Sequence, residues 1–89
     1  MQVWDQTGFG GRADFINGPR RYRTLGNLPG GRVWTNRIRS LRLGRTAIVT
    51  AWSDENFRGP SLRFGGDTGP TQVRETGAAS IESVEITCR

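Results

Sequence analysis

Eight carboxylates and a single cysteine are the side chains that could act here as acids, bases or nucleophiles. Asp54 and Glu55 are adjacent, and a pair of carboxylates can supply the general acid and base of a hydrolase. The chain contains no His, so it lacks the usual general base near neutral pH and the commonest metal ligand. Without a His partner, Cys88 has no group that would activate its thiol. We therefore predict that the chain is not an enzyme.

Three glycine pairs, at residues 10–11, 30–31 and 65–66, are the places where a loop could hold a phosphate group. The chain has no Lys, so none of the pairs can form a P-loop, and none has the spacing of the dinucleotide fingerprint. We interpret these pairs as turns. The 13 Gly of the chain favour turns and β-structure over helix.

All 13 basic residues are Arg, and the formal net charge is +5. A basic balance is typical of proteins with anionic partners, but most of these arginines are dispersed along the chain. Arg20, Arg21 and Arg23 form one tight group around Tyr22. Together with Arg32, this group is a candidate site for an anion or a nucleic acid, in which the Tyr22 ring would stack on a base. A tyrosine in such a pattern more often packs inward between solvated neighbours, so nucleic acid is the less favoured partner.

The length of 89 residues predicts one domain with one core. Cys88 is the sole cysteine, so no intramolecular disulfide can form, and we expect a monomer or a weak dimer through Cys88. No apolar run approaches the ~20 residues that span a bilayer, so we expect no membrane partner, and no small-molecule substrate is indicated. No secretory signal is evident, which leaves a cytoplasmic and a secreted location both open.

The chain repeats itself, since an aromatic, a Phe, a Gly and a small residue recur 48 residues later. The first copy is Trp4, Phe9, Gly11 and Ala13, and the second is Trp52, Phe57, Gly59 and Ser61. A second phrase, residues 36–41, aligns with residues 79–84 at an offset of 43. Two ordered phrases per half indicate a duplicated supersecondary unit within a single domain 1–89, with halves at about 1–44 and 45–89.

Short apolar and β-branched runs between Gly and Pro predict four strands in each half. The expected strands are Gln2–Gln6, Arg12–Ile16, Arg20–Thr24, Ile38–Leu43, Ala47–Ser53, Pro60–Phe64, Gln72–Arg74 and Ile81–Thr87. Residues 76–80 could hold no more than a short helical turn. Long connections at residues 25–35 and 75–80 fit Greek keys. We therefore predict an all-β sandwich of two four-stranded antiparallel Greek-key motifs, with Ala47–Trp52 as a central strand and Trp34 in the core.

Each repeated phrase predicts a hairpin whose two aromatic side chains pack on each other at the corner. Trp4 would contact Phe9, and Trp52 would contact Phe57, across loops at residues 5–8 and 53–56. Gly11 and Gly59 would supply backbone geometry that a Cβ would obstruct.

The same phrases resemble the signature of the βγ-crystallin superfamily, and in particular its microbial, bacterial members. That signature is an aromatic, four residues, an aromatic, any residue, Gly, any residue and Ser. Ala13 in place of the first Ser is the one departure. Because both halves carry the phrase in order, the resemblance covers essentially the whole chain. It implies a βγ-crystallin-like sandwich.

The resemblance also implies calcium sites, because microbial members often bind two Ca²⁺ through a six-residue phrase. It reads Asn/Asp, Asn/Asp, any, any, Ser/Thr, Ser, and its fifth-position hydroxyl is a direct ligand. In residues 35–40 of this chain, Thr35 replaces the first Asn/Asp and Arg39 replaces that hydroxyl. A guanidinium has no acceptor and repels a cation. In residues 78–83, Ala78 and Ala79 replace both leading oxygens, and Glu82 is at the fifth position.

We therefore expect calcium binding to be absent or weak. The residues left for a degenerate metal site are Asp5, Asn36, Arg37, Ser40, Ser53, Ser80, Glu82 and Ser83. Arg39 either pairs with Glu82, its counterpart in the other half, or points into water.

The leading hypothesis is a non-enzymatic structural or stress-type domain with no cofactor, or with Ca²⁺ bound weakly. One alternative is a secreted proteinase-inhibitor or antimicrobial module of the same fold. A single Cys departs from the disulfides on which those relatives rely. The other alternative is a residual low-affinity calcium-binding protein.

Overall fold

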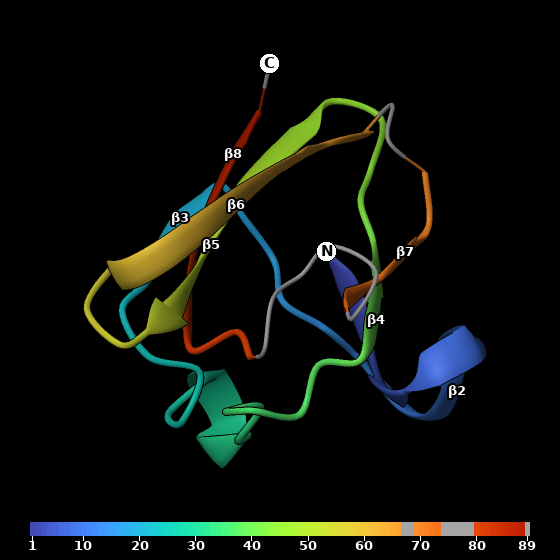
Figure 1. Ribbon diagram of the computed structural model, residues 1–89, viewed down its shortest axis with the longest axis horizontal. Helices are drawn as coiled ribbons and strands as arrows, with labels where there is room; N and C mark the ends of the chain where they lie inside the picture. The colour runs from blue at the N-terminus through green and yellow to red at the C-terminus, as the bar shows by residue number, and fades with distance from the viewer. Residues whose placement is uncertain (67–68, 74–79, 89) are drawn as a thin grey trace.

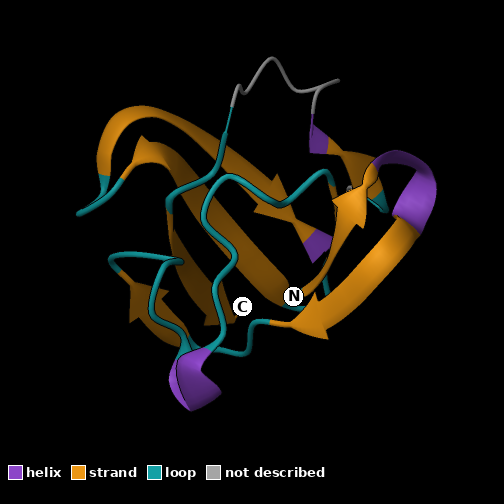
Figure 2. Ribbon diagram, turned by 90° about the horizontal axis from the view of Figure 1, so that it is seen from below, coloured by secondary structure: helices purple, strands orange, loops and turns teal. Residues whose placement is uncertain are grey.

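The computed structural model describes residues 1–66, 69–73 and 80–88. Its eight strands, in chain order, are β1 (Gln2–Gln6), β2 (Gly10–Phe15), β3 (Arg20–Tyr22), β4 (Ser40–Arg42), β5 (Ala47–Asp54), β6 (Arg58–Gly65), β7 (Thr71–Gln72) and β8 (Ser83–Cys88). The short 3₁₀ turns η1 (Thr7–Phe9) and η2 (Pro29–Gly31) lie in the loops (Figure 2). No helix in the described part of the chain is long and apolar enough to cross a membrane.

The strands form two four-stranded antiparallel sheets, which lie on opposite sides of the molecule in Figure 1. Their strand orders are β2-β1-β4-β7 and β3-β8-β5-β6. β5 lies between β8 and β6, which confirms the prediction of a central strand there. The predicted all-β sandwich is therefore correct.

The two halves exchange their third strands. β3 belongs to the first half but pairs with β8, and β7 belongs to the second half but pairs with β4. Each sheet thus contains three strands of one half and one short strand of the other. Because neither sheet is complete without the other half, the two halves depend on each other for their strand pairing.

The core lies between the sheets and is closed by the long connection after β3. Val3 on β1, Val49 on β5 and Val84 on β8 have no exposed surface. The connection adds Leu25 and Trp34, and the Trp34 N–H donates to the Leu25 carbonyl at 2.7 Å. Trp34 is 1 % exposed, which confirms its predicted place in the core.

Two strands begin later than the sequence predicts, at Ser40 and Ser83 rather than at Ile38 and Ile81. Both isoleucines are buried, so their apolar character reflects core packing before the strand begins. β3 ends at Tyr22 rather than at residue 24. The predicted end of the seventh strand, Arg74, and most of the possible turn at 76–80 lie outside the described residues.

Candidate functional site

Each half folds a hairpin corner in which a Trp packs edge-on against a Phe. In corner one (residues 4–9) the Trp4 and Phe9 ring centroids are 5.2 Å apart at 85°. In corner two (residues 52–57) the Trp52 and Phe57 centroids are 5.0 Å apart at 74°. Both predicted contacts are confirmed, and each is worth about 0.5–1.5 kcal/mol beyond burial.

Both corners force two consecutive residues into the left-handed region of the backbone. These are Gly8 (φ 70°) and Phe9 (φ 59°) in corner one, and Asn56 (φ 59°) and Phe57 (φ 58°) in corner two. This conformation costs a residue with a side chain roughly 1–2 kcal/mol, so a Phe there must be held by other contacts.

A buried serine at the start of the last strand of the same half, β4 or β8, holds each corner. The Ser40 hydroxyl accepts a hydrogen bond from the Phe9 N–H at 3.2 Å and donates to the Gln6 carbonyl at 2.9 Å. The Ser83 hydroxyl accepts from the Phe57 N–H at 3.1 Å and donates to the Asp54 carbonyl at 2.6 Å. Both serines have no exposed surface. Their hydroxyls are therefore engaged in fixing the corners.

A glycine and an aspartate complete each corner. Gly11 (φ 74°) and Gly59 (φ 82°) have left-handed backbones, and a Cβ on either would run into the carboxylate of Asp5 or Asp54. The predicted need for glycine is thus confirmed. Asp5 Oδ1 also accepts the Arg12 N–H at 2.8 Å. The residue equivalent to Arg12 is Pro60, which has no N–H, so Asp54 lacks this bond.

In the first calcium-like phrase, the side chain of Arg39 bonds to the backbone of the same loop. Arg39 Nη1 donates to the Asn36 carbonyl oxygen at 3.2 Å, and Asn36 has a positive φ of 54°. Arg37 is exposed, and its backbone N–H donates to the Trp34 carbonyl at 3.2 Å. The guanidinium of Arg39 therefore lies against the Asn36 carbonyl oxygen of this loop.

The second phrase has the opposite electrostatic character. Burial raises the pKa of Glu82, and the nearby carboxylates of Glu55 and Asp54 raise this pKa further. Beside them, the Ser80 hydroxyl donates to the Ser53 carbonyl at 3.4 Å. No ion pair joins Arg39 to Glu82, although both residues lie in the described part of the chain. The pairing of these two residues that the sequence left open does not form.

No protein-family model matches this sequence, and neither does any curated protein sequence. Solved structures do match it. One is described as "Evolution of the eye lens beta-gamma-crystallin domain fold", with a TM-score of 0.82 at 15 % identity, covering 99 % of this chain and 84 % of that one. The chain has the βγ-crystallin fold.

Two further structures of this fold also match along nearly the whole chain. The N-terminal domain of protein S matches with a TM-score of 0.78 at 15 % identity, covering 98 % of this chain and 93 % of that one. A βγ-crystallin domain from Flavobacterium johnsoniae matches with a TM-score of 0.78 at 18 % identity, covering 99 % and 93 %. The signature resemblance seen in the sequence is thus confirmed at the level of the fold.

Within this βγ-crystallin fold, the predicted metal-site residues fall into two separate groups. Asp5 and Ser40 lie at corner one, with Asn36 and Arg37 in the loop that leads to Ser40, and near corner two lie Ser53, Ser80, Glu82 and Ser83. Within residues 1–66, 69–73 and 80–88, no three carboxylate or thiol side chains gather closely enough to hold a metal ion.

A polar network in the first half was not predicted from the sequence. Asp14 Oδ1 accepts Arg32 Nη1 at 2.7 Å, and Asp14 Oδ2 accepts Trp34 Nε1 at 2.9 Å. Burial works to raise the pKa of Asp14. Hydrogen bonds from Trp34 and Phe15, together with the Arg32 guanidinium, outweigh burial and lower this pKa below its ordinary value. The partners are 18 and 20 residues away in the sequence, and no local pattern links them.

The exchanged strands also contact the corners, which the sequence did not reveal. On β3, the Arg21 guanidinium lies 4.3 Å from the centre of the Phe57 ring, and its Nε is 3.0 Å from Glu85. On β7, the side-chain oxygen of Gln72 accepts the Gly8 N–H at 2.9 Å. Each corner is therefore covered by a strand from the other half.

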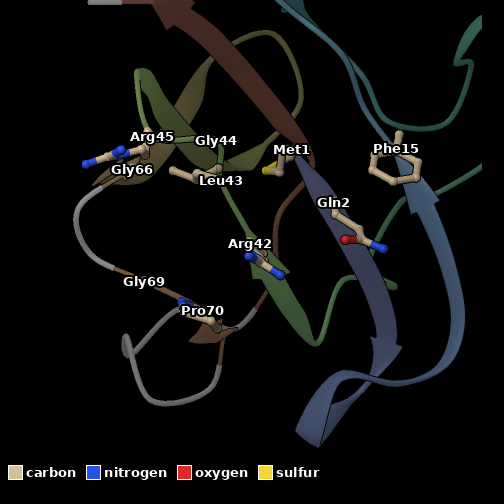
Figure 3. A pocket seen from close by; sticks show the side chains of 10 residues that line it. All are labelled: Met1, Gln2, Phe15, Arg42, Leu43, Gly44, Arg45, Gly66, Gly69 and Pro70. Atoms are coloured by element: carbon tan, nitrogen blue, oxygen red, sulfur yellow. The ribbon is translucent and has the colours of Figure 1, made fainter.

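A hollow of about 430 Å³ opens near the N-terminus. Figure 3 shows Gln2 and the 54 % exposed Phe15 on one side of it and Gly66, Gly69 and Pro70 on the other. Arg42 and Arg45 add charge. Gly66 and Gly69 of its lining stand on either side, in the sequence, of residues 67–68, which are not among the described residues, so we assign the hollow no ligand.

Proposed function

We propose that this chain is a non-enzymatic structural domain of the βγ-crystallin fold whose calcium sites are disabled or weak. The observation that carries the proposal is the bond from Arg39 to the Asn36 carbonyl at 3.2 Å. Calcium requires six to eight oxygen ligands. The guanidinium supplies none, engages one loop oxygen and brings a positive charge to the loop.

Intrinsic stability supports the structural role. The two corners are fixed by serine hydroxyls, aromatic pairs and left-handed glycines, all supplied by the chain itself. No metal is needed to satisfy these buried groups, since no buried side-chain nitrogen or oxygen of the described residues lacks a hydrogen-bond partner.

The proposed domain also has no catalytic activity. The chain has no His, and its one cysteine, Cys88, is exposed near the end of β8. Asp54 and Glu55 are on the open corner two rather than in an enclosed cleft. This arrangement offers neither an activated nucleophile nor a desolvated acid–base pair.

Weak calcium binding at corner two is the second candidate function. The carboxylates of Glu55 and Asp54 repel that of Glu82 there, and Asp54 has no bond like the one from the Arg12 N–H to Asp5, because Pro60 stands in the place of Arg12. A cation would relieve that repulsion. Because the phrase lacks both leading oxygens, we expect such binding to be weak at millimolar Ca²⁺.

The test is calorimetric titration with Ca²⁺, followed by thermal unfolding in millimolar Ca²⁺. The matched pair is Thr35→Asn and Thr35→Asn/Arg39→Thr, since the double variant restores the whole first phrase and the single variant keeps the arginine. Stabilisation of about 2.7 kcal/mol is expected once Ca²⁺ exceeds the dissociation constant a hundredfold, and only in the double variant. A rise of that size in the unaltered chain would contradict the proposal.

A further inference from the structure

The edge of β3 that faces away from β8 carries two neighbouring hollows, which have two lining residues in common. One, of about 330 Å³, is lined by Asn17, Gly18, Pro19, Arg20, Tyr22, Pro29 and Arg32. The other, of about 290 Å³, is lined by Arg20, Arg21, Tyr22, Arg23, Thr24 and Asn27. Because both contain Arg20 and Tyr22, they form one continuous surface, which we call the β3 groove. β3 pairs with β8 alone, so nothing in the described sheet covers its other edge.

The β3 groove has four arginines and no acidic residue among its lining side chains. Two of the arginines are neutralised, since Arg21 pairs with Glu85 and Arg32 pairs with Asp14. Arg20 and Arg23 have no acidic partner among the described residues. They leave about two uncompensated positive charges in one hollow.

The neutral polar groups of the groove are suited to the same kind of ligand. Thr24 Oγ1 accepts the Gly26 N–H at 3.0 Å, which leaves its O–H free to donate. Asn27 is exposed and adds an amide donor. Two guanidinium groups, a hydroxyl and an amide form a set of donors that matches the oxygens of a phosphate group.

Tyr22 cannot serve as a platform for a base. Its hydroxyl donates to the Asn17 carbonyl, and only 8 % of the residue is exposed. The Arg20 guanidinium lies 5.0 Å from the ring centre. The groove therefore offers charge without an open aromatic surface, so it can hold a backbone but cannot stack with a base.

We propose that the β3 groove binds the phosphodiester backbone of a single-stranded nucleic acid without reading its bases. A flexible strand can place successive phosphates in two hollows that meet at Arg20, and Arg20 and Arg23 would each neutralise one phosphate. This activity goes beyond the proposed structural function and does not depend on the state of the calcium phrases.

The experiment measures binding of the full chain to fluorescent oligo(dT) by anisotropy across a salt series. The test variant is Arg20→Gln/Arg23→Gln. The control is Arg58→Gln/Arg63→Gln, which removes the same charge from β6, the opposite edge strand of the same sheet, where both arginines are exposed. Thermal unfolding of all three proteins verifies that they are folded.

Loss of two phosphate contacts should reduce the slope of log K against log salt by about 1.4, because each contact contributes about 0.7 for single strands. Affinity at low salt should fall about tenfold or more in the test variant and remain nearly unchanged in the control. An abasic strand of the same length should bind as well as oligo(dT).

Three outcomes would overturn the inference. The first is absence of oligo(dT) binding at low salt. The second is an equal loss of affinity in both double variants, which would mean that net charge alone attracts the strand. The third is binding to a sulfated polysaccharide such as heparin but not to the abasic strand, which would assign the groove to a different polyanion.

Discussion

Corner one and corner two have the same backbone geometry but different charged residues around it. In each, a Trp packs on a Phe, two consecutive residues are left-handed, and a buried serine bonds to the same two backbone positions. Arg39 bonds through its backbone N–H to the Trp4 carbonyl of corner one, whereas Glu82 bonds through its backbone N–H to the Trp52 carbonyl of corner two and lies near the Glu55 carboxylate. The backbone geometry of the corner is thus independent of the charge around it.

The comparison of the two corners shows which residues of the repeated phrases stabilise the corner backbone. Ser40 and Ser83 end the two phrases, and each satisfies an N–H and a carbonyl that the bend would otherwise leave unpaired. The residues one position earlier, Arg39 and Glu82, differ in charge without altering the corner. We therefore expect substitutions at the serines to be costly and substitutions at the charged positions to be mild.

The largest effect should follow from Ser40→Ala or Ser83→Ala. Each leaves a backbone N–H and a carbonyl without a partner, so each should reduce the free energy of unfolding by about 2–3 kcal/mol in urea denaturation. The control is Ser61→Ala on β6, where the serine is exposed, with a change within about 0.5 kcal/mol. Markedly unequal losses at the two serines would break the equivalence of the corners.

Asp14→Asn should have the next largest effect, because it removes a charge that only the first half has. The equivalent residue in the second half is Leu62. Loss of the charge-assisted bonds to Arg32 and Trp34 should cost about 1–2 kcal/mol at neutral pH.

The pH dependence identifies the source of that effect. Because the folded pKa of Asp14 is lowered, its stabilisation is present above the ordinary pKa of an aspartate and is lost as the pH falls through the folded pKa. Unfolding curves from neutral to acid pH should therefore converge for the two proteins. A difference that stays constant with pH would show that packing, rather than charge, is responsible.

Arg21→Gln tests whether the strand from the first half stabilises corner two. It removes the contact with the Phe57 ring and the pair with Glu85, and the Arg21 side chain is 63 % exposed, so we expect a loss of about 0.5–1 kcal/mol. Arg63→Gln, on the other edge strand, should change the stability by less. If Arg21→Gln has no effect, the covering of corner two by β3 is not energetically important.

The smallest effect is expected for Glu82→Gln, and its sign is opposite. The raised pKa means that ionised Glu82 destabilises the fold above its folded pKa, and that this penalty disappears as the carboxyl is protonated at lower pH. At neutral pH the variant should be more stable by less than about 0.5 kcal/mol. A clear loss of stability there would show that Glu82 makes a favourable contact.

The sequence by itself determined the repeat, the strands and the chemistry of each corner. An aromatic pair, a glycine and a small residue at fixed spacing act within a few residues of one another, so their geometry follows from local constraints. The effect of Arg39 in place of a hydroxyl could also be predicted from the sequence, because a guanidinium cannot accept a hydrogen bond or coordinate a cation in any position. The central strand at Ala47–Trp52 could be predicted as well, because its residues are uniformly apolar or β-branched.

Only the tertiary structure decided which strands pair and which charges meet. The exchange of β3 and β7 depends on packing between the halves, and short polar strands carry no pattern that names their neighbour. The Asp14 network, the serine bonds and the separation of Arg39 from Glu82 join or part residues far apart in the chain. Such contacts are set by how two sheets close over one core, because distance along the sequence does not fix distance in space.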